Sequence, residues 1–541
     1  MFRKDYILPK KILRCERTEG EEHLLSSKTQ MAAFACGCPC KIQPGGWILL
    51  DFGMEYNGGV QIICQDMMGK KNARLRIRFG ESAMECMSDI GYKGATNDHS
   101  VRDQELLAPW VGILEYGHTG YRFIRIDNCD EVTVSFMQIY GVYEHSGKDI
   151  LGTFHSSDER LNRIWDVGVR TVYLNNNDLI TDGIKRDRLV WIGDMHPESS
   201  SILRLFGYDR SVNNSLDYIK RITPPDEWMN GIASYTMWWI KIQHDLYCYS
   251  GDKAYLSEQM PYLKACVQTL GNTIREDGSC DIGFKFIDWP SGNDPTAMDC
   301  GIFAMMSVAL SSAAALFALF NEKACETYCL EKLRVLRRFE PNPNGNKQMG
   351  ALLVFAGEKD AARMNEELLA VDPLKGLSTF LCYYVMRARA EANDMRGTLN
   401  LIRRYYGGML DLGATTFFED FDLEWTKGAK PLDSLLAPGE YDVHGDTGGH
   451  CYRGYRHSLC HGWSAGVVPF LSEYVLGVRF AAAGCRKVEI RPDLGDLAWA
   501  EGSVPTPQGV LNVRVWREKG EVKAEHNDLP GTEIVINKIS G

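Results

Sequence analysis

A stretch of 13 residues, Asp182–Asp194, combines side chains that suit chemistry on a polar ring. Its sequence, DGIKRDRLVWIGD, carries three carboxylates, three basic groups and a tryptophan around an apolar centre. A surface run of charges does not need Leu189, Val190 and Trp191 among its ions. Carboxylates and guanidinium groups that converge with an indole can form a cleft that binds a polar ring, stacks against one of its faces and moves protons. A sugar is the first candidate ligand.

The composition excludes several other partners. The chain has 541 residues, 45% of them hydrophobic and 24% charged, which is typical of a globular protein. That length exceeds what one hydrophobic core usually supports, so we expect two to four domains. The formal net charge is -11, and both nucleic acid and an anionic membrane favour a basic surface. We therefore expect a neutral substrate, no nucleic-acid partner and no membrane partner, while the oligomeric state stays open.

The N-terminal residues and the cysteines bear on the compartment. The start, MFRKDYILPKKILRCERTEG, has basic residues but no apolar segment of the kind found in secretory signals. The 17 cysteines show no disulfide framework, so we expect reduced thiols and a cytoplasmic protein. Three of them, Cys36, Cys38 and Cys40, form a CGCPC cluster. A metal site there lacks a fourth ligand, and we expect strand or surface cysteines instead, with no metal and no cofactor.

The elements that must position the motif fall into three regions. Residues 1–150 contain period-two segments, which predict an N-terminal antiparallel β-sandwich. Residues 151–478 have a helical period and no intervening strand pattern, which predicts an all-α domain. Residues 479–541 return to the strand pattern and predict a small β-domain. The predicted strands of the first region are 47–52, 60–64, 73–79, 121–126 and 132–136. The predicted helices are 158–175, 198–220, 231–250, 255–275, 300–320, 322–339, 347–370, 378–392 and 395–407.

From about residue 45 onward, the chain resembles the α-L-rhamnosidases of the six-hairpin (α/α)6 toroid group of glycoside hydrolases. Four segments carry the resemblance, together with a similar C-terminal tail: DGIKRDRLVWIGD at 182–194, FIDWP at 286–290, GATTFFEDF at 413–421 and RHSLCHGW at 456–463. The resemblance implies a toroid catalytic domain between the two β-domains. It also implies an inverting hydrolase that removes terminal α-L-rhamnose from an oligosaccharide or glycoconjugate.

The resemblance assigns roles to particular residues. Asp187 takes the position of the catalytic acid, and Glu419 takes that of the general base that activates water. Inversion needs this division of labour, with one carboxyl group protonated and the other ionised. The residues that the resemblance places around the sugar are Asp182, Arg186, Trp191, Asp194, Trp238 or Trp239, Asp288, Trp289 and His461.

Two positions depart from the family pattern. The family's acid is usually glutamate, and Asp187 is one methylene shorter. The residue before the base is often tryptophan, and here it is Phe418. A related sugar, or a carbohydrate-binding protein without activity, therefore remains an alternative reading. Glu198, just beyond the motif, is an alternative proton donor.

The same residues also have purely structural readings. Asp182 and Asp194 could cap helices or pair with arginines. Trp238 and Trp239 are adjacent on a predicted helix, so at least one of them belongs to the core.

Three further groups of residues could bind a ligand. His457 and His461 could share a helix face as a metal pair, with His450 or Asp446 as a third ligand, although a hydrogen bond from His461 to the sugar is favoured. The loop 437–456 should shape the pocket entrance and the preference for the leaving group. The polar segment 94–103 reads equally as a calcium or ligand loop and as a capped turn.

Overall fold

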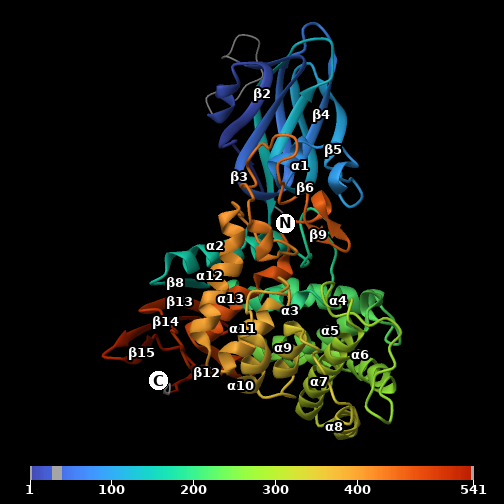
Figure 1. Cartoon of the computed structure of the whole chain (residues 1–541), viewed down its shortest axis with the longest axis vertical. Helices are drawn as coiled ribbons and strands as arrows, with labels where there is room; N and C mark the ends of the chain where they lie inside the picture. The colour runs from blue at the N-terminus through green and yellow to red at the C-terminus, as the bar shows by residue number, and fades with distance from the viewer. Residues whose placement is uncertain (1–2, 27–38, 538–541) are drawn as a thin grey trace.

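The computed structural model describes residues 3–26 and 39–537. An N-terminal β region stands at one end of the molecule, a large helical region forms its middle, and smaller sheets pack beside the helices near the C-terminus (Figure 1). The order of these regions along the chain is the one expected from the sequence periods. Cys36 and Cys38 lie outside the described residues, and the 15 described cysteines are free thiols.

The N-terminal region contains seven antiparallel strands in one hydrogen-bonded sheet. The five predicted strand segments fall in four of them, because 47–52 and 60–64 are two parts of one long strand. A short helix, α1 (Ala83–Met87), follows the fourth strand. The strands are β1 (Arg3–Ile7), β2 (Lys11–Glu19), β3 (Cys40–Asp66), β4 (Asn72–Gly80), β5 (Asp103–Pro109), β6 (Gly112–Asn128) and β7 (Val134–His145).

The sheet folds into two layers because β3 and β6 are long enough to belong to both. The first part of β3 pairs with β2, the end of β6 and, at Cys40–Ile42, with β7, whereas its last part pairs with β7 and the start of β6. The register shifts between Asp51 and Tyr56, at Gly53, whose φ of 87° favours glycine. The layers thus form a continuous, folded sheet.

Alternation along the strands fills the space between the layers. One buried cluster takes every second residue of each strand. It includes Ile48, Leu50, Phe52, Ile62, Cys64, Leu75, Ile77, Phe79, Ile124 and Ile126. The opposite side chains Trp47, Leu49 and Phe123 form a smaller cluster with Ala83 and Cys86 of α1. The sandwich therefore buries apolar surface on two faces, one of them under α1.

The middle region is helical and has one dominant hydrophobic core. The predicted helix 198–220 is two helices, because Gly207 adopts a φ of 80° and the side chain of Asp209 caps a new start. The predicted helix 347–370 is likewise interrupted before Asp360. The helices are α2 (Glu159–Asn175), α3 (Met195–Leu205), α4 (Arg210–Ile222), α5 (Ala233–Ser250), α6 (Lys253–Asn272), α7 (Pro295–Leu319), α8 (Lys323–Leu336), α9 (Lys347–Phe355), α10 (Ala361–Met364), α11 (Cys382–Glu391), α12 (Met395–Asp411) and α13 (Val467–Phe470).

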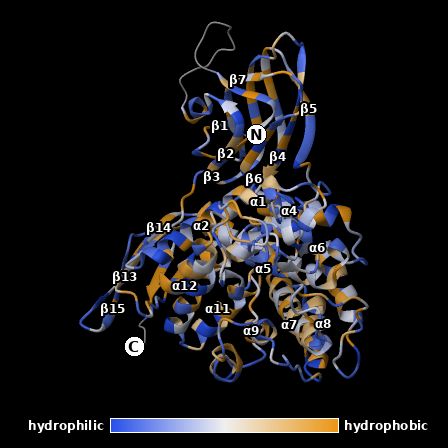
Figure 2. Cartoon of the chain, turned by 45° about the horizontal axis from the view of Figure 1, so that its top comes forward, coloured by the Kyte–Doolittle hydropathy of each residue, from blue (hydrophilic) through white to orange (hydrophobic). Residues whose placement is uncertain are grey.

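Helix α7 contributes many buried side chains to this core. Among the described residues it is the one helix long and apolar enough to cross a membrane, but most of it is buried inside the protein. Asp294 caps its N-terminus by accepting from Thr296 N at 3.0 Å and Ala297 N at 3.1 Å, and Pro295 occupies its first turn. Figure 2 shows hydrophobic positions along α7 within a helical region of mixed hydropathy. Burial in the hydrophobic core therefore explains why α7 is so apolar.

Two small sheets complete the chain. One contains β11 (Val478–Ala482), β12 (Lys487–Ile490) and β16 (Glu533–Ile536), and the other contains β13 (Trp499–Thr506), β14 (Gly509–Glu518) and β15 (Glu521–His526). The edge of the second sheet is β8 (Thr153–Ser156), which pairs with β13 immediately before α2 begins. The C-terminal strands are thus fastened to the start of the helical region.

Candidate active site

The motif 182–194 forms a closed loop between α2 and α3. Asp182 N donates to Leu189 O at 3.1 Å, and Leu189 N donates to Asp182 Oδ1 at 2.9 Å. At the tip, Asp187 and Arg188 have φ values of 53° and 58°, in the left-handed region. Such residues cost on the order of 1 kcal/mol each and occur often at functional sites. The reversal directs Asp187 away from the loop's own backbone.

The three basic side chains of the loop take three different directions. Lys185 contacts Glu81 of the sandwich at 2.8 Å. Arg186 forms an ion pair with Glu419, and Arg188 donates to the carbonyl of His118. The motif is therefore a junction at which the sandwich, the helical region and the segment around Glu419 meet.

Glu419 is held by backbone contacts with a second segment. Its own N–H donates to Ser458 O at 3.0 Å, and the N–H of Ser458 donates to its Oε2 at 3.3 Å. Burial raises the pKa of Glu419 to about 7, although the guanidinium of Arg186 opposes the change. A carboxyl group with that pKa is poised to accept a proton near neutrality.

Asp187 differs from the other carboxyl groups because it keeps contact with solvent. Its side chain is 19% exposed, whereas that of Glu419 is 2% exposed. Its Oδ2 accepts the indole N–H of Trp191 at 3.1 Å, and its Oδ1 lies 2.9 Å from Nδ1 of His99. The Nε atom of Arg186 lies 3.7 Å from the same Oδ1. The structure thus brings both predicted catalytic carboxyl groups to one guanidinium group.

Asp182, Asp194 and His461 form the buried floor next to these groups. Nε2 of His461 lies 3.7 Å from Asp182 Oδ2 and 3.9 Å from Glu419 Oε1. The hydroxyl of Tyr235 donates to Asp194 Oδ1 at 2.9 Å. Burial raises the pKa of both aspartates well above its ordinary value and lowers that of His461 well below. Protonated carboxyl groups and a neutral imidazole can each donate and accept hydrogen bonds, as sugar hydroxyls require.

Glu198 lies beneath this floor, on α3. Its carboxyl group packs against Gly462, where an added Cβ would lie 1.5 Å from Oε1. Neither carboxylate oxygen has a hydrogen-bond partner in the part of the chain that the structure describes. Burial, with Asp194 and Asp182 nearby, raises the pKa of Glu198 well above its ordinary value. Glu198 is thus a buried neighbour of the site, more deeply placed than Asp187.

Asp288 and Trp289 belong to the rim on the other side of Glu419. Asp288 accepts from Ser378 Oγ at 2.8 Å and from Ser291 N at 3.1 Å, so its carboxyl group organises the loop before α7. Trp289 is 36% exposed, and its ring stacks on His450 with the centroids 5.7 Å apart.

A cavity of about 620 Å³ lies along this rim. It is lined by Pro290 and residues of the loop that carries His450, and also by Asp420 and Trp425. Gly448, Gly449 and His450 of the loop 437–456 thus border a hollow that Asp420, the neighbour of Glu419, also lines.

Trp238 and Trp239 lie in the helical core, and both are 0% exposed. The indole N–H of Trp239 donates to Leu216 O at 3.2 Å. Trp238 stacks on His196 and contacts Phe380, which in turn stacks on Trp463. The structure does not bring either tryptophan against the carboxyl groups around Arg186.

The histidine pair does not have the predicted helical geometry. Residues 457–461 are not helical, and Nε2 of His457 accepts the backbone N–H of Asp420 at 2.9 Å. His450 stacks on Trp289, and Asp446 pairs with Lys93 at 2.6 Å. These four side chains have separate partners and do not converge as metal ligands.

Three other potential metal ligands do converge, at the interface with the sandwich. Atoms of Glu81, Glu85 and His444 lie within 4.8 Å of one another. The ammonium group of Lys185 lies 2.8 Å from Glu81 and 3.3 Å from Glu85, so it already supplies positive charge there.

Sequence reasoning missed two side chains of the site, His99 and Arg456. Nη2 of Arg456 lies 2.7 Å from Nε2 of His99. His99 lies in the polar segment 94–103. That segment is a turn, in which Asn97 Nδ2 donates to Asp103 O at 3.0 Å. Nothing in the spacing signalled that the turn reaches Asp187.

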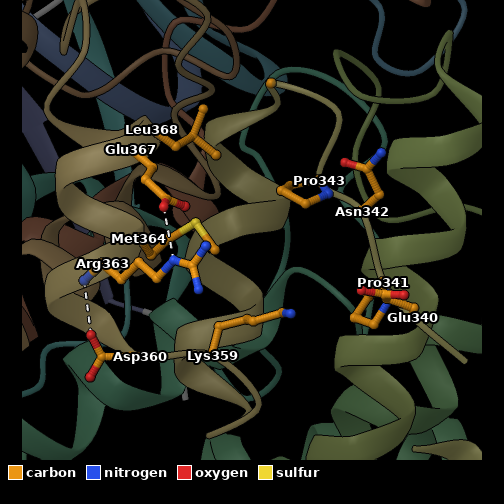
Figure 3. A pocket seen from close by; sticks show the side chains of 11 residues that line it. Glu340, Pro341, Asn342, Pro343, Lys359, Asp360, Arg363, Met364, Glu367 and Leu368 are labelled. Carbon is orange, nitrogen blue, oxygen red and sulfur yellow. Dashed lines mark hydrogen bonds and ion pairs between the residues drawn. The ribbon is translucent and has the colours of Figure 1, made fainter. Parts of the chain in front are cut away.

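A hollow of about 760 Å³ lies elsewhere, between the segment 340–345 and α10. Figure 3 shows Arg363 bridging Asp360 and Glu367 on one wall, with Asn342 and Pro343 opposite. Arg363 is 77% exposed and Glu367 is 58% exposed. The hollow is an open surface groove with an ordinary helix-surface ion pair.

Two carboxyl groups in different environments are what glycoside hydrolysis requires. Residues 149–335 match the family model of the bacterial alpha-L-rhamnosidase six-hairpin glycosidase domain. The resemblance read from the motifs is therefore confirmed, and residues 149–335 are similar to the six-hairpin domain of the α-L-rhamnosidase family.

Individual relatives agree with this assignment. The chain is 23% identical over 530 residues to an alpha-L-rhamnosidase of Alteromonas sp. (strain LOR), covering 86% of this chain and 53% of the relative. An alpha-L-rhamnosidase from Dictyoglomus thermophilum has a similar fold, with a TM-score of 0.75 at 17% identity, over 98% of this chain and 58% of that one. A rhamnosidase from Klebsiella oxytoca with rhamnose bound has a TM-score of 0.67 at 18% identity, over 87% of this chain and 96% of that one. The chain thus spans about half the length of the first two.

Proposed function

We propose that this protein is an inverting glycoside hydrolase that removes terminal α-L-rhamnose from oligosaccharides or glycoconjugates. Asp187 is the proton donor and Glu419 is the general base. The proposal rests on one observation: the carboxyl groups of Asp187 and Glu419 both contact the guanidinium of Arg186. Arg186 lies in the loop 182–194, within the segment that matches the α-L-rhamnosidase family model. The rhamnose-bound relative with a similar fold supports the choice of sugar.

The two carboxyl groups differ in environment. Glu419 is buried and has a pKa of about 7, so near neutrality a large fraction is ionised and able to take a proton from water. Asp187 is partly exposed and faces outward, where a leaving group can depart. Inversion places water and leaving group on opposite faces of the sugar, and we assign Glu419 to the water and Asp187 to the leaving group.

The floor fits a neutral sugar. Burial raises the pKa of Asp182 and of Asp194 well above its ordinary value, and His461, whose pKa burial lowers, lies beside Asp182. These groups can bind hydroxyls in either direction without requiring charge on the ligand. Trp191 contributes an apolar ring edge next to Asp187, and its indole meets Tyr235 at 87°.

The wider architecture follows from the same family. We infer that α2–α13 close into the (α/α)6 toroid, as the catalytic domain 151–478. The accessory sandwich 1–150 and the C-terminal β-domain 479–541 flank it. The name of the matched six-hairpin domain supports this arrangement, as does the order of regions along the chain.

One experiment tests the function. The protein is incubated with a panel of aryl glycosides that includes the α-L-rhamnoside, and NMR follows the anomer first released. We expect β-L-rhamnose as the first product. We also expect a loss of about 100-fold or more in Asp187→Asn and Glu419→Gln, and none in the exposed control Glu367→Gln. Release of another sugar would favour the related exo-glycosidase, and binding of rhamnose without turnover would favour an inactive relative. First release of α-L-rhamnose would exclude inversion.

A further inference from the structure

The turn between η2 (Tyr92–Gly94) and β5 reaches from the sandwich to the candidate acid. Asn97 fixes its shape, because the side-chain oxygen accepts from Arg102 N at 3.1 Å and from Asp103 N at 3.2 Å. The side-chain nitrogen closes the turn on Asp103 O. His99 projects from a turn whose ends are therefore pinned.

The turn is also docked on the helical region. Gly94 has a φ of 82°, and an added Cβ would lie 2.7 Å from Arg453 O, so only glycine permits this approach. Asp98 Oδ2 accepts from Arg456 Nε at 3.1 Å. Two contacts on the N-terminal side of His99 thus hold the turn against Arg453 and Arg456, at the start of the RHSLCHGW motif.

Arg456 fixes the tautomer of His99. A guanidinium group can only donate, so Nε2 of His99, 2.7 Å from Arg456 Nη2, must be the acceptor. The remaining ring proton is then on Nδ1, and Nδ1–H points at Asp187 Oδ1 at 2.9 Å. The carboxylate of Asp98 also lies near the ring, with Oδ2 3.5 Å from Nε2. The imidazole is therefore a directed donor to Asp187.

We propose that His99 of the β-sandwich is a positioning residue for the catalytic acid, which it orients and supports through a single N–H donor fixed by Arg456. His99 holds Oδ1 of Asp187 and Trp191 holds Oδ2. An aspartate has one torsion fewer than glutamate, so two donors define its position. The sandwich then completes the active site, a conclusion that rests on the proposed function.

The donors act during proton transfer. As the bond from the anomeric carbon to the leaving oxygen breaks, its electron pair stays on that oxygen, which takes the proton of Asp187. Asp187 becomes a carboxylate, and the N–H groups of His99 and Trp191 stabilise the charge that develops on it. A leaving group that must be protonated depends on this support, whereas an activated phenolate depends on it little.

The test compares His99→Leu, which removes the donor, with His99→Asn, whose amide N–H stands near the Nδ1 position. We expect His99→Leu to lower turnover of methyl α-L-rhamnoside about 10- to 100-fold, and that of 4-nitrophenyl α-L-rhamnoside by less than about 3-fold. His99→Asn should recover most of the methyl rhamnoside activity. The control His23→Leu removes another sandwich histidine, which lies 3.5 Å from Glu22, and should change neither substrate. Equal losses on both substrates, or none, would overturn the proposal.

A second measurement is independent of turnover. With ¹⁵N-labelled histidine, NMR should show His99 as the Nδ1–H tautomer in the wild-type protein, and the Nδ1 resonance should move in Asp187→Asn. An Nε2–H tautomer would refute the proposed donor. If the wild-type chain cleaves no rhamnoside, the proposed function fails, while this spectrum still decides whether His99 donates to Asp187.

Discussion

Asp187 and Glu419 contact different nitrogen atoms of one guanidinium group. Nε of Arg186 lies 3.7 Å from Asp187 Oδ1, and Nη2 pairs with Glu419. Arg186 is itself held by the carbonyl of Cys451, which accepts from Nη1 at 3.0 Å. The positive charge of Arg186 favours the ionised form of Glu419, which the proposed role of general base requires.

The pH dependence should follow Glu419. Because its pKa is raised to about 7, the fraction ionised falls as the pH drops through 7, and kcat/KM should fall with it. Arg186 lowers the pKa of Glu419, so Arg186→Met should raise that pKa and move the acidic limb to higher pH. We expect this shift of the acidic limb in kcat/KM profiles measured from pH 5 to 9, with Arg363→Met, at an exposed position, as the control. An acidic limb that stays in place in Arg186→Met would contradict the assignment of the base.

Trp191 should act on Asp187 through its N–H group. Trp191→Phe keeps an aromatic ring beside Tyr235 but removes the donor to Asp187 Oδ2. A hydrogen bond to a charged group is worth about 1.5–3 kcal/mol, so we expect about a 10-fold loss on methyl α-L-rhamnoside and a smaller one on the nitrophenyl substrate. Trp516→Phe in β14 is the control. A change confined to KM would instead assign Trp191 to binding alone.

The sequence predicted the regions well because their periods are local properties. Alternation revealed β3, β4 and β6, and apolar periodicity revealed α7, because burial imposes these patterns on each element separately. It did not reveal that Gly207 breaks a helix, since a helical period can continue across a single left-handed residue. Nor did the sequence periods show that β8 joins the C-terminal sheet, because a strand of four residues is too short for an alternating pattern to be recognised.

The candidate site was predicted from motifs, and the predictions fail for residues whose position depends on tertiary contacts. Asp187 and Glu419, far apart in sequence, do meet at Arg186. Trp238 and Trp239 have the residue type of a sugar platform, but a helix of this core buries both. His99 could not be assigned, because its role depends on how a turn of one region docks on another.

Glu198 offers a test of where the proton donor lies. If Asp187 is the acid, Glu198→Gln should retain turnover within about 3-fold, since an amide resembles a protonated carboxyl group in shape. If Glu198 were the donor, this variant would lose about 100-fold or more on methyl α-L-rhamnoside. Asp187→Asn measured beside it provides the comparison.

Glu198 should also affect stability in a pH-dependent way. Burial raises its pKa in the folded state, so the folded protein binds the proton more tightly than the unfolded chain does. Its contribution to folding stability therefore falls as the pH rises above the unfolded value of about 4.3. Glu198→Gln removes this loss of stability. The difference in Tm between the variant and the wild type should therefore rise from pH 5 to pH 8. A difference in Tm that is the same at every pH would show that Glu198 is not a buried proton-holding group.

Lys185 lies within the motif but should stabilise the protein instead of acting on the substrate. Its ammonium group contacts Glu81 and Glu85, both fully buried, and donates to the carbonyl of Tyr455 at 3.0 Å. Lys185→Met removes the cation beside Glu81 and leaves Glu85 with only the guanidinium of Arg102, 3.8 Å away, which costs about 3–5 kcal/mol. Calorimetry should show a much lower Tm, with recovery in Lys185→Met/Glu81→Gln, because the second change removes one of the uncompensated charges. Lys427→Met, at an exposed pair with Glu424, is the control. If instead Lys185→Met kept the wild-type Tm and lost only turnover, Lys185 would belong to the chemistry and not to the junction between sandwich and helices.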